Sequence, residues 1–104
     1  MESKVFHLYR SSLPDKKYSI RTLEGTKVIH FGAKGYEDFT KHKDEERKHL
    51  YIERHNKNED WTKEGMMSAG FWSRWLLWNK KTLKESIEDV EERFGVDIIY
   101  SKSK

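Results

Sequence analysis

The sequence predicts an α+β fold in which a small antiparallel sheet packs against about three helices. Two observations predict it: strand-like alternation fills the first third of the chain, and helix-like periodicity fills most of the rest. The 104 residues suit one domain, 1–104, with a frayed tail from about residue 101. Although 38% of the residues are charged, five Phe, five Tyr and four Trp are more aromatics than disordered chains carry. We therefore expect a folded, very polar domain with an aromatic core.

The N-terminal third predicts a strand followed by a β-hairpin. Val5–Tyr9 is apolar and aromatic, and turn-forming residues follow it. Residues 17–22 and 27–31 alternate between apolar and polar side chains, and Glu24-Gly25 is suited to a tight connection between them. We expect the glycine-rich segment 32–35 to end the second hairpin strand.

The middle of the chain predicts two helices of different character. From about Thr40 to Asn56, one stripe recurs with helical spacing, and it consists of Arg47, Leu50, Tyr51 and Arg54. This segment has few apolar residues, so we expect a surface helix. In contrast, Ser68–Asn79 has almost no polar face, which places this Trp-rich helix at the centre of the core or against a partner.

The last third predicts a capped helix and a final strand. Thr82-x-x-Glu85 has the capping-box pattern, and apolar residues follow with helical spacing at Leu83, Ile87, Val90 and Phe94. Gly95 supplies the stop signal. Residues 96–100 then alternate, and we expect this short strand to join the N-terminal hairpin in one sheet.

Composition excludes several classes of protein and site. With no Cys, the chain has no disulfides, thiolate metal ligands or Cys nucleophile. The first residues lack the apolar run of a signal peptide, and the apolar cluster Phe71–Trp78 is too short to cross a bilayer. We therefore expect no membrane partner.

Positive charge is concentrated in the first third of the chain. Residues 1–34 hold seven Lys or Arg against three Asp or Glu, whereas residues 82–97 hold two against six. This asymmetry suits a solvated surface, contact with nucleic-acid phosphates, or self-association through opposite patches. The predicted phosphate contacts are Lys16, Lys17, Arg21, Lys27, Lys34, Lys43, Arg47 and Arg54.

The Trp-rich segment predicts core packing and a homodimer interface. Its aromatic residues are Phe71, Trp72, Trp75 and Trp78, and with Trp61 they are also able to stack on bases. Helical spacing of aromatics is more typical of a core, and surplus aromatic surface is typical of an interface.

No active site can be assembled from the sequence. The three histidines of the middle third, His42, His49 and His55, lack a metal-ligand spacing such as His-Glu-x-x-His. His30 lies between Ile29 and Phe31 in a predicted strand, where a hydrogen-bonded structural role is expected. Segment 32–35 lacks the Lys-Ser/Thr pair of a phosphate loop, and no serine lies in a nucleophile motif. We predict no enzyme activity, no cofactor and no metal.

A string of motifs gives the chain a family resemblance. It runs through Lys16-Lys17-Tyr18, His30-Phe31-Gly32, Tyr36-x-Asp38-Phe39-Thr40-x-His42-Lys43-Asp44, Arg54-His55, Ala69-Gly70-Phe71-Trp72-Ser73-Arg74-Trp75-Leu76-Leu77-Trp78 and Ser86-Ile87. From about residue 16 to residue 87 the chain resembles small uncharacterised proteins of nucleocytoplasmic large DNA viruses, such as marseilleviruses and mimivirus-like viruses. The resemblance implies a viral origin and packaging in the virion, with the host cytoplasm or nucleus as its location during infection. It implies no activity.

These observations together favour a non-enzymatic, homodimeric viral protein that binds DNA electrostatically. The alternative is a protein–protein adaptor that engages host or viral proteins through the Trp-rich helix and its acidic neighbour. A metal-dependent nuclease built on His42, His49 and His55 is the least favoured hypothesis.

Overall fold

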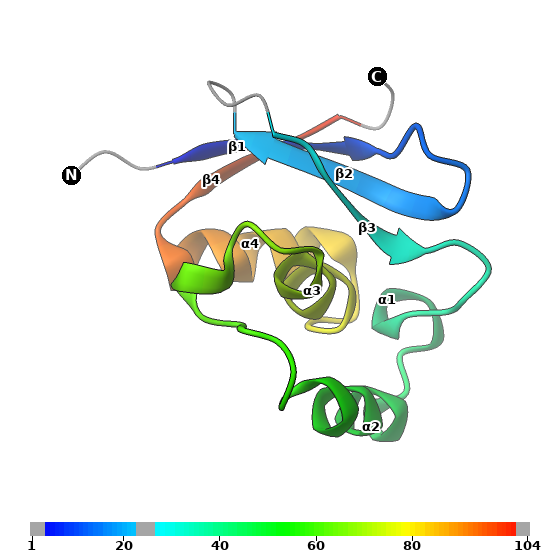
Figure 1. Ribbon diagram of the computed structural model, residues 1–104. Coiled ribbons are helices and arrows are strands. Elements are labelled where there is room, and N and C mark those ends of the chain that lie inside the picture. The colour runs from blue at the N-terminus through cyan, green and yellow to red at the C-terminus, as the bar shows by residue number, and fades with distance from the viewer. Residues whose placement is uncertain (1–3, 23–26, 102–104) are drawn as a thin grey trace.

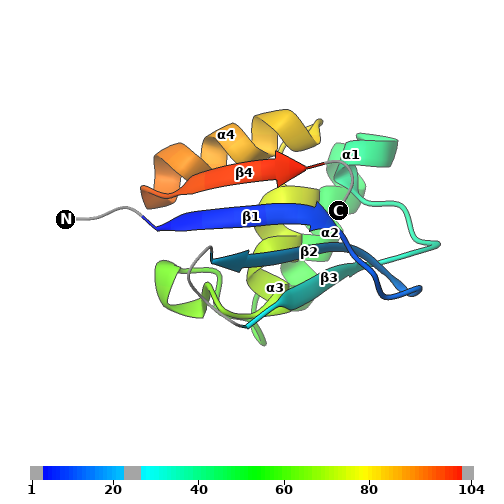
Figure 2. The same ribbon diagram turned by 90° about the horizontal axis from the view of Figure 1, so that it is seen from above.

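The fold consists of a four-stranded sheet with helices on one side. It is described by a computed structural model that covers residues 4–22 and 27–101. The sheet order is β3-β2-β1-β4, with β1 at Val5–Arg10, β2 at Lys16–Thr22, β3 at Ile29–Ala33 and β4 at Asp97–Ser101. Figures 1 and 2 show the helices beneath the sheet, with α2 farthest from it, and no described helix above it. The α+β class predicted from the sequence is therefore confirmed.

The final strand gives the sheet a mixed topology. β1 pairs antiparallel with β2, and β2 pairs antiparallel with β3, but β4 runs parallel to β1, from Val5 opposite Asp97 to Tyr9 opposite Ser101. The reason lies in the approach to β4: the chain leaves α4 at the edge where β1 begins, and the Asp97 N–H donates to the Lys4 carbonyl over 2.9 Å. The sequence predicted a wholly antiparallel sheet, so the parallel direction of β4 differs from that prediction.

Two boundaries in the sheet differ from those predicted. β3 continues through Gly32 to Ala33, because Gly32 adopts φ +80° inside the strand and Ala33 pairs with Lys16. Ser101, predicted to be frayed, belongs to β4. The predicted Glu24-Gly25 connection and tail residues 102–104 lie outside the described residues.

The predicted helix from Thr40 to Asn56 is two helices. α1 spans Phe39–His42 and α2 spans Glu45–His55. Lys43 between them has a left-handed backbone with φ 56°, and its N–H donates to the Phe39 carbonyl, which ends α1. Asp44 then begins α2 as its N-cap, since Oδ1 accepts from the N–H groups of Glu46 at 3.0 Å and Arg47 at 3.4 Å. The single predicted helix is therefore wrong, because Lys43 ends one helix and Asp44 caps the next.

The Trp-rich segment is helical, with a change of pitch in its middle. Lys63–Gly65 forms the short 3-10 helix η1, and α3 spans Ala69–Trp72 after an N-cap at Ser68. The chain continues into the π-helical turn η2 at Ser73–Leu77, which ends where the Trp78 N–H donates to the Ser73 carbonyl over 3.1 Å. π-helical turns concentrate at functional sites, and this one lies beside the cleft described below.

The C-terminal helix α4 spans Leu83–Phe94 with the predicted caps. The Glu85 N–H donates to Thr82 Oγ1 over 3.1 Å, and the Thr82 hydroxyl lies 3.1 Å from Glu85 Oε1. Gly95 has φ 67° and its N–H donates to the Glu91 carbonyl. The N-cap at Thr82 and the glycine stop are therefore confirmed.

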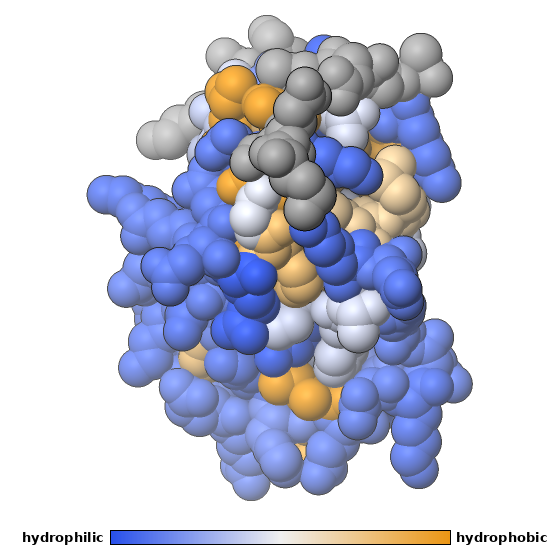
Figure 3. Space-filling view, turned by 90° about the vertical axis from the view of Figure 1, so that its left-hand side faces the viewer, coloured by the Kyte–Doolittle hydropathy of each residue, from blue (hydrophilic) through white to orange (hydrophobic). Residues whose placement is uncertain are grey.

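The core lies between the lower face of the sheet and the layer formed by α3, η2 and α4. Phe71 and Trp72 are both 0% exposed at its centre. They make edge-on contacts with each other, with centroids 4.8 Å apart, and Trp72 makes another with Phe6 at 5.0 Å. Figure 3 shows a mostly hydrophilic side of the molecule on which the hydrophobic residues form small separate patches. Within residues 4–22 and 27–101, no helix combines the length and apolarity needed to cross a membrane.

Candidate functional site

A cleft of about 540 Å³ lies between the start of β2, the end of β3 and the helical layer. Its walls come from segments far apart in the sequence: the β2 start, the loop after β3, the cleft-facing side of α2, and the α3–η2 segment. The volume lies within the range of small-ligand sites. All four residues of the stripe predicted on α2 line it, namely Arg47, Leu50, Tyr51 and Arg54.

Four of the eight predicted phosphate contacts meet at this cleft: Lys16, Lys17, Arg47 and Arg54. Lys17 Nζ forms an ion pair of 2.5 Å with Asp38 and donates to the Tyr36 carbonyl over 2.6 Å. Arg47 forms a longer and exposed pair of 3.4 Å with Glu37. Among the described residues, Lys16 and Arg54 have no ion-pair partner, so their charges are available to a ligand.

The other four predicted contacts do not line the cleft. Arg21 lies in a separate hollow of about 440 Å³ that is also lined by His7, Tyr9 and His30. Lys27 and Lys34 are exposed residues on either side of β3, and Lys43 Nζ donates to the Thr40 carbonyl over 2.7 Å. The predicted phosphate contacts are therefore divided between different parts of the surface, because Lys16 and Lys17 lie at the start of β2 and Arg21 lies near its other end.

Stacked rings form the floor of the cleft. The Tyr51 ring lies 4.3 Å from the Trp78 ring at 4°, and 4.2 Å from the His55 ring at 28°. Burial raises the pKa of the Tyr51 hydroxyl, and the Glu59 carboxylate raises that pKa further. Tyr51 is therefore a neutral, rigid element of the floor at physiological pH.

Glu59 organises the end of the cleft beside His55. One carboxylate oxygen lies 3.2 Å from His55 Nδ1, and the other accepts from Trp61 Nε1 over 2.9 Å. A Cβ at Gly70 would lie 2.7 Å from the Glu59 carboxyl carbon, so the glycine makes room for this carboxylate. Sequence reasoning missed Glu59, although its spacing four residues after His55 was a usable signal.

The side chains predicted for a dimer interface are engaged within the chain. Phe71 and Trp72 are fully buried, while Trp75 and Trp78 are half-buried. The Trp75 ring lies beneath the guanidinium groups of Arg74 at 4.3 Å and Arg93 at 4.5 Å. Burial and the nearby Arg93 charge lower the pKa of Arg74. These four aromatics contribute to the core, which leaves little of their surface for a partner.

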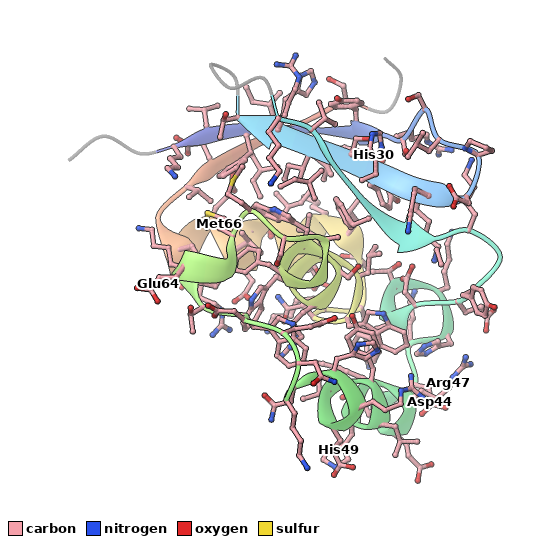
Figure 4. All side chains as sticks on the ribbon, in the orientation of Figure 1. His30, Asp44, Arg47, His49, Glu64 and Met66 are labelled. Atoms are coloured by element: carbon pink, nitrogen blue, oxygen red, sulfur yellow. The ribbon has the colours of Figure 1, made fainter. Side chains whose placement is uncertain are left out.

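The histidines are engaged separately. His49 pairs with Glu53 at 3.0 Å, His55 pairs with Glu59, and His42 Nδ1 accepts from the Asp44 N–H over 2.9 Å. Figure 4 shows His30 on the sheet and His49 on the distant outer side of α2. Within the described part of the chain, no group of three or more His, Asp or Glu side chains is placed to hold a metal ion.

His30 has the structural role that its position predicts. Its Nδ1 lies 2.8 Å from the hydroxyl of Ser11 and 2.8 Å from that of Ser19. Ser19 is 0% exposed, so this interaction satisfies a buried hydroxyl. The predicted hydrogen-bonded role of His30 is confirmed.

Comparison with known proteins gives one partial match. Residues 6–55 match the sequence model of a family of unknown function (DUF5754), which is slightly less than half of the 104 residues. This stretch runs from β1 to the end of α2, and it includes all four cationic residues of the cleft. Comparisons with the curated proteins and with the solved structures found no match.

Proposed function

We propose that the protein is a non-enzymatic nucleic-acid-binding protein whose cleft holds the phosphate backbone. The observation that carries the proposal is the convergence of Lys16, Lys17, Arg47 and Arg54 on one cleft from two separate segments of the chain. Clustered Lys and Arg side chains supply most of the affinity of proteins for nucleic-acid backbones. Arginine in addition makes paired hydrogen bonds to phosphate oxygens.

The carboxylates around the cleft do not cancel this charge equally. Asp38 is 3% exposed, and besides Lys17 it accepts from the Thr40 N–H over 2.9 Å. Glu59 is directed to His55 and Trp61. Asp38 and Glu59 therefore already accept from donors of the protein. A phosphate that enters the cleft meets mainly Lys16 and Arg54, and it also meets Arg47 if Arg47 leaves its exposed partner Glu37.

The proposal is tested by fluorescence anisotropy with labelled DNA and charge-removing variants. Lys16→Gln and Arg54→Gln should each weaken binding about tenfold at about 50 mM salt. Each should also reduce the slope of log affinity against log salt concentration by about one, which is the loss of one phosphate contact. Arg21→Gln is the matched control, because it removes the same charge from the separate hollow. It should leave the affinity within about twofold of wild type.

Absence of DNA binding at low salt would contradict the proposal. An equal effect of Arg21→Gln and Arg54→Gln would also contradict it, because the cleft would then have no special role. If nuclease-treated pull-downs recover proteins while DNA does not bind, the protein–protein adaptor is the better hypothesis.

The proposed setting is a particle of a large DNA virus; the homodimer stays a prediction from the sequence, and burial of Phe71 and Trp72 means that it would have to use other surface. The sequence resemblance supports the viral setting, and mass spectrometry of purified virions tests it. Analytical ultracentrifugation tests the dimer. A monomer at all concentrations would remove the homodimer from the proposal without affecting the cleft.

A further inference from the structure

We propose that the cleft selects single-stranded over duplex nucleic acid by stacking an unpaired base on Tyr36. This inference rests on the proposed function and specifies its ligand. Tyr36 lines the cleft, yet its residue is 75% exposed, the highest value among the exposed large hydrophobic residues described. An exposed aromatic ring beside the cations of a basic cleft has the arrangement that single-strand-binding proteins use to stack bases.

The backbone of Tyr36 is held in place although its ring is free. Its carbonyl accepts from Lys17 Nζ over 2.6 Å, and its N–H donates to the Ala33 carbonyl over 3.4 Å. The preceding Gly35 has φ +90°, and a Cβ built on it has no neighbour within 4 Å, so the tip of this turn is open to solvent. The ring is therefore presented from a fixed turn, which lowers the entropy lost when a base binds.

The other rings of the cleft are already stacked. Tyr51 has Trp78 on one side at 4.3 Å and His55 at 4.2 Å, and it is only 8% exposed. An incoming base would have to separate these rings before stacking on them. Among the described aromatic residues of the cleft, Tyr36 offers the most accessible ring face.

The combination of free cations and one exposed ring favours a single strand. Proteins that bind single strands combine a positive groove along the backbone with aromatic side chains that stack on the bases. A duplex presents its phosphates but keeps its bases paired and stacked. Except at its ends, it therefore exposes no base face on which Tyr36 could stack. A duplex would therefore use only the cations of the cleft, whereas a single strand would use them together with Tyr36.

The test compares one labelled DNA strand of about 12 nucleotides with the same strand in a duplex, by anisotropy at about 50 mM salt. The single strand should bind wild type about tenfold more tightly than the duplex. Tyr36→Ala should weaken single-strand binding about tenfold and change duplex binding less than about twofold, and Tyr36→Trp should restore it. Leu50→Ala is the matched control: Leu50 also lines the cleft and is 50% exposed, but has no ring.

The outcomes separate this inference from the proposed function. If both forms of DNA bind equally and Tyr36→Ala has no effect, the stacking role is wrong while the basic cleft stands. If Leu50→Ala weakens binding as much as Tyr36→Ala does, loss of apolar area explains the effect and stacking is again wrong. If neither form binds at low salt, the proposed function fails and this inference fails with it. Circular dichroism of each variant confirms that it is folded.

Discussion

Lys17 Nζ lies 2.5 Å from Asp38 Oδ2, and this ion pair joins strand β2 to the N-cap of α1. The two side chains are 16% and 4% exposed, so the pair is largely removed from water. Asp38 also caps the helix through Thr40, and Lys17 also holds the carbonyl of Tyr36. One buried pair thus holds the sheet, the turn at Tyr36 and the first helix together around the cleft.

We expect Lys17→Met to destabilise the protein by about 3 kcal/mol, since it leaves the Asp38 carboxylate buried without its cation. Urea denaturation measures the change in the free energy of unfolding. Arg47→Met is the matched control, because the Arg47–Glu37 pair has side chains that are 50% and 63% exposed. It should cost less than about 0.5 kcal/mol. Equal losses in the two variants would show that burial of the Lys17 pair has no special importance.

Gly70→Ala should destabilise the protein by about 1 kcal/mol, although alanine is the better helix former. The added Cβ would lie 2.7 Å from the Glu59 carboxyl carbon and would push this carboxylate away from His55 and Trp61. The measurement is a double-mutant cycle with Glu59→Ala. In the Glu59→Ala background the same glycine substitution should be neutral or stabilising, and a loss that persists there would contradict this explanation.

Lys43→Gly should stabilise the protein by about 0.5 kcal/mol. Lys43 adopts φ 56°, a left-handed conformation that costs an L-residue about 1 kcal/mol and costs glycine little. Part of the gain is offset by loss of the Nζ bond to the Thr40 carbonyl. Thermal unfolding measures the change, and Lys41→Gly, inside α1, is the control that should destabilise. Lys43→Gly should bind DNA like wild type, because Lys43 lies outside the cleft.

The sequence predicted well those features that depend on local patterns. The N-cap at Thr82, the stop at Gly95 and the stripe from Arg47 to Arg54 all depend on residues within a few positions of one another. Such spacings determine which side chains share a helix face before any tertiary contact forms. This is why the four-residue stripe of α2 that lines the cleft could be anticipated.

Features decided by long-range contacts could not be predicted. The direction of β4 depends on where α4 ends beneath the sheet, and the break at Lys43 depends on a left-handed residue that no propensity favours. Glu59 gains its importance from Trp61 and from the space at Gly70, which becomes visible only in the packed structure. The division of the basic residues is likewise visible only in the packed structure, where Lys16 and Lys17 line the cleft and Arg21 lines the separate hollow.

Stability should fall in alkaline solution because of Tyr18. Burial, together with the neighbouring Tyr100, raises the pKa of the Tyr18 hydroxyl from 10.0 to about 12. Between these two pH values the unfolded chain has released the Tyr18 proton while the folded chain keeps it, so raising the pH favours unfolding. The stabilisation is complete below about pH 10 and is lost as the pH rises toward about 12.

Tyr18→Phe keeps the ring packed beside Phe31, 5.9 Å away, and removes the ionisable hydroxyl. Its free energy of unfolding should therefore fall less steeply than that of wild type between about pH 10 and about pH 12. Burial also raises the pKa of Tyr51, so the Tyr18→Phe protein should still lose some stability at alkaline pH. The double variant with Tyr18→Phe and Tyr51→Phe should lose less stability over the same pH range. Urea denaturation at stepped pH measures these slopes, and the ultraviolet absorbance of tyrosinate reports the ionisation directly. Identical slopes for wild type and Tyr18→Phe would mean that Tyr18 ionises as readily in the folded chain as in the unfolded one.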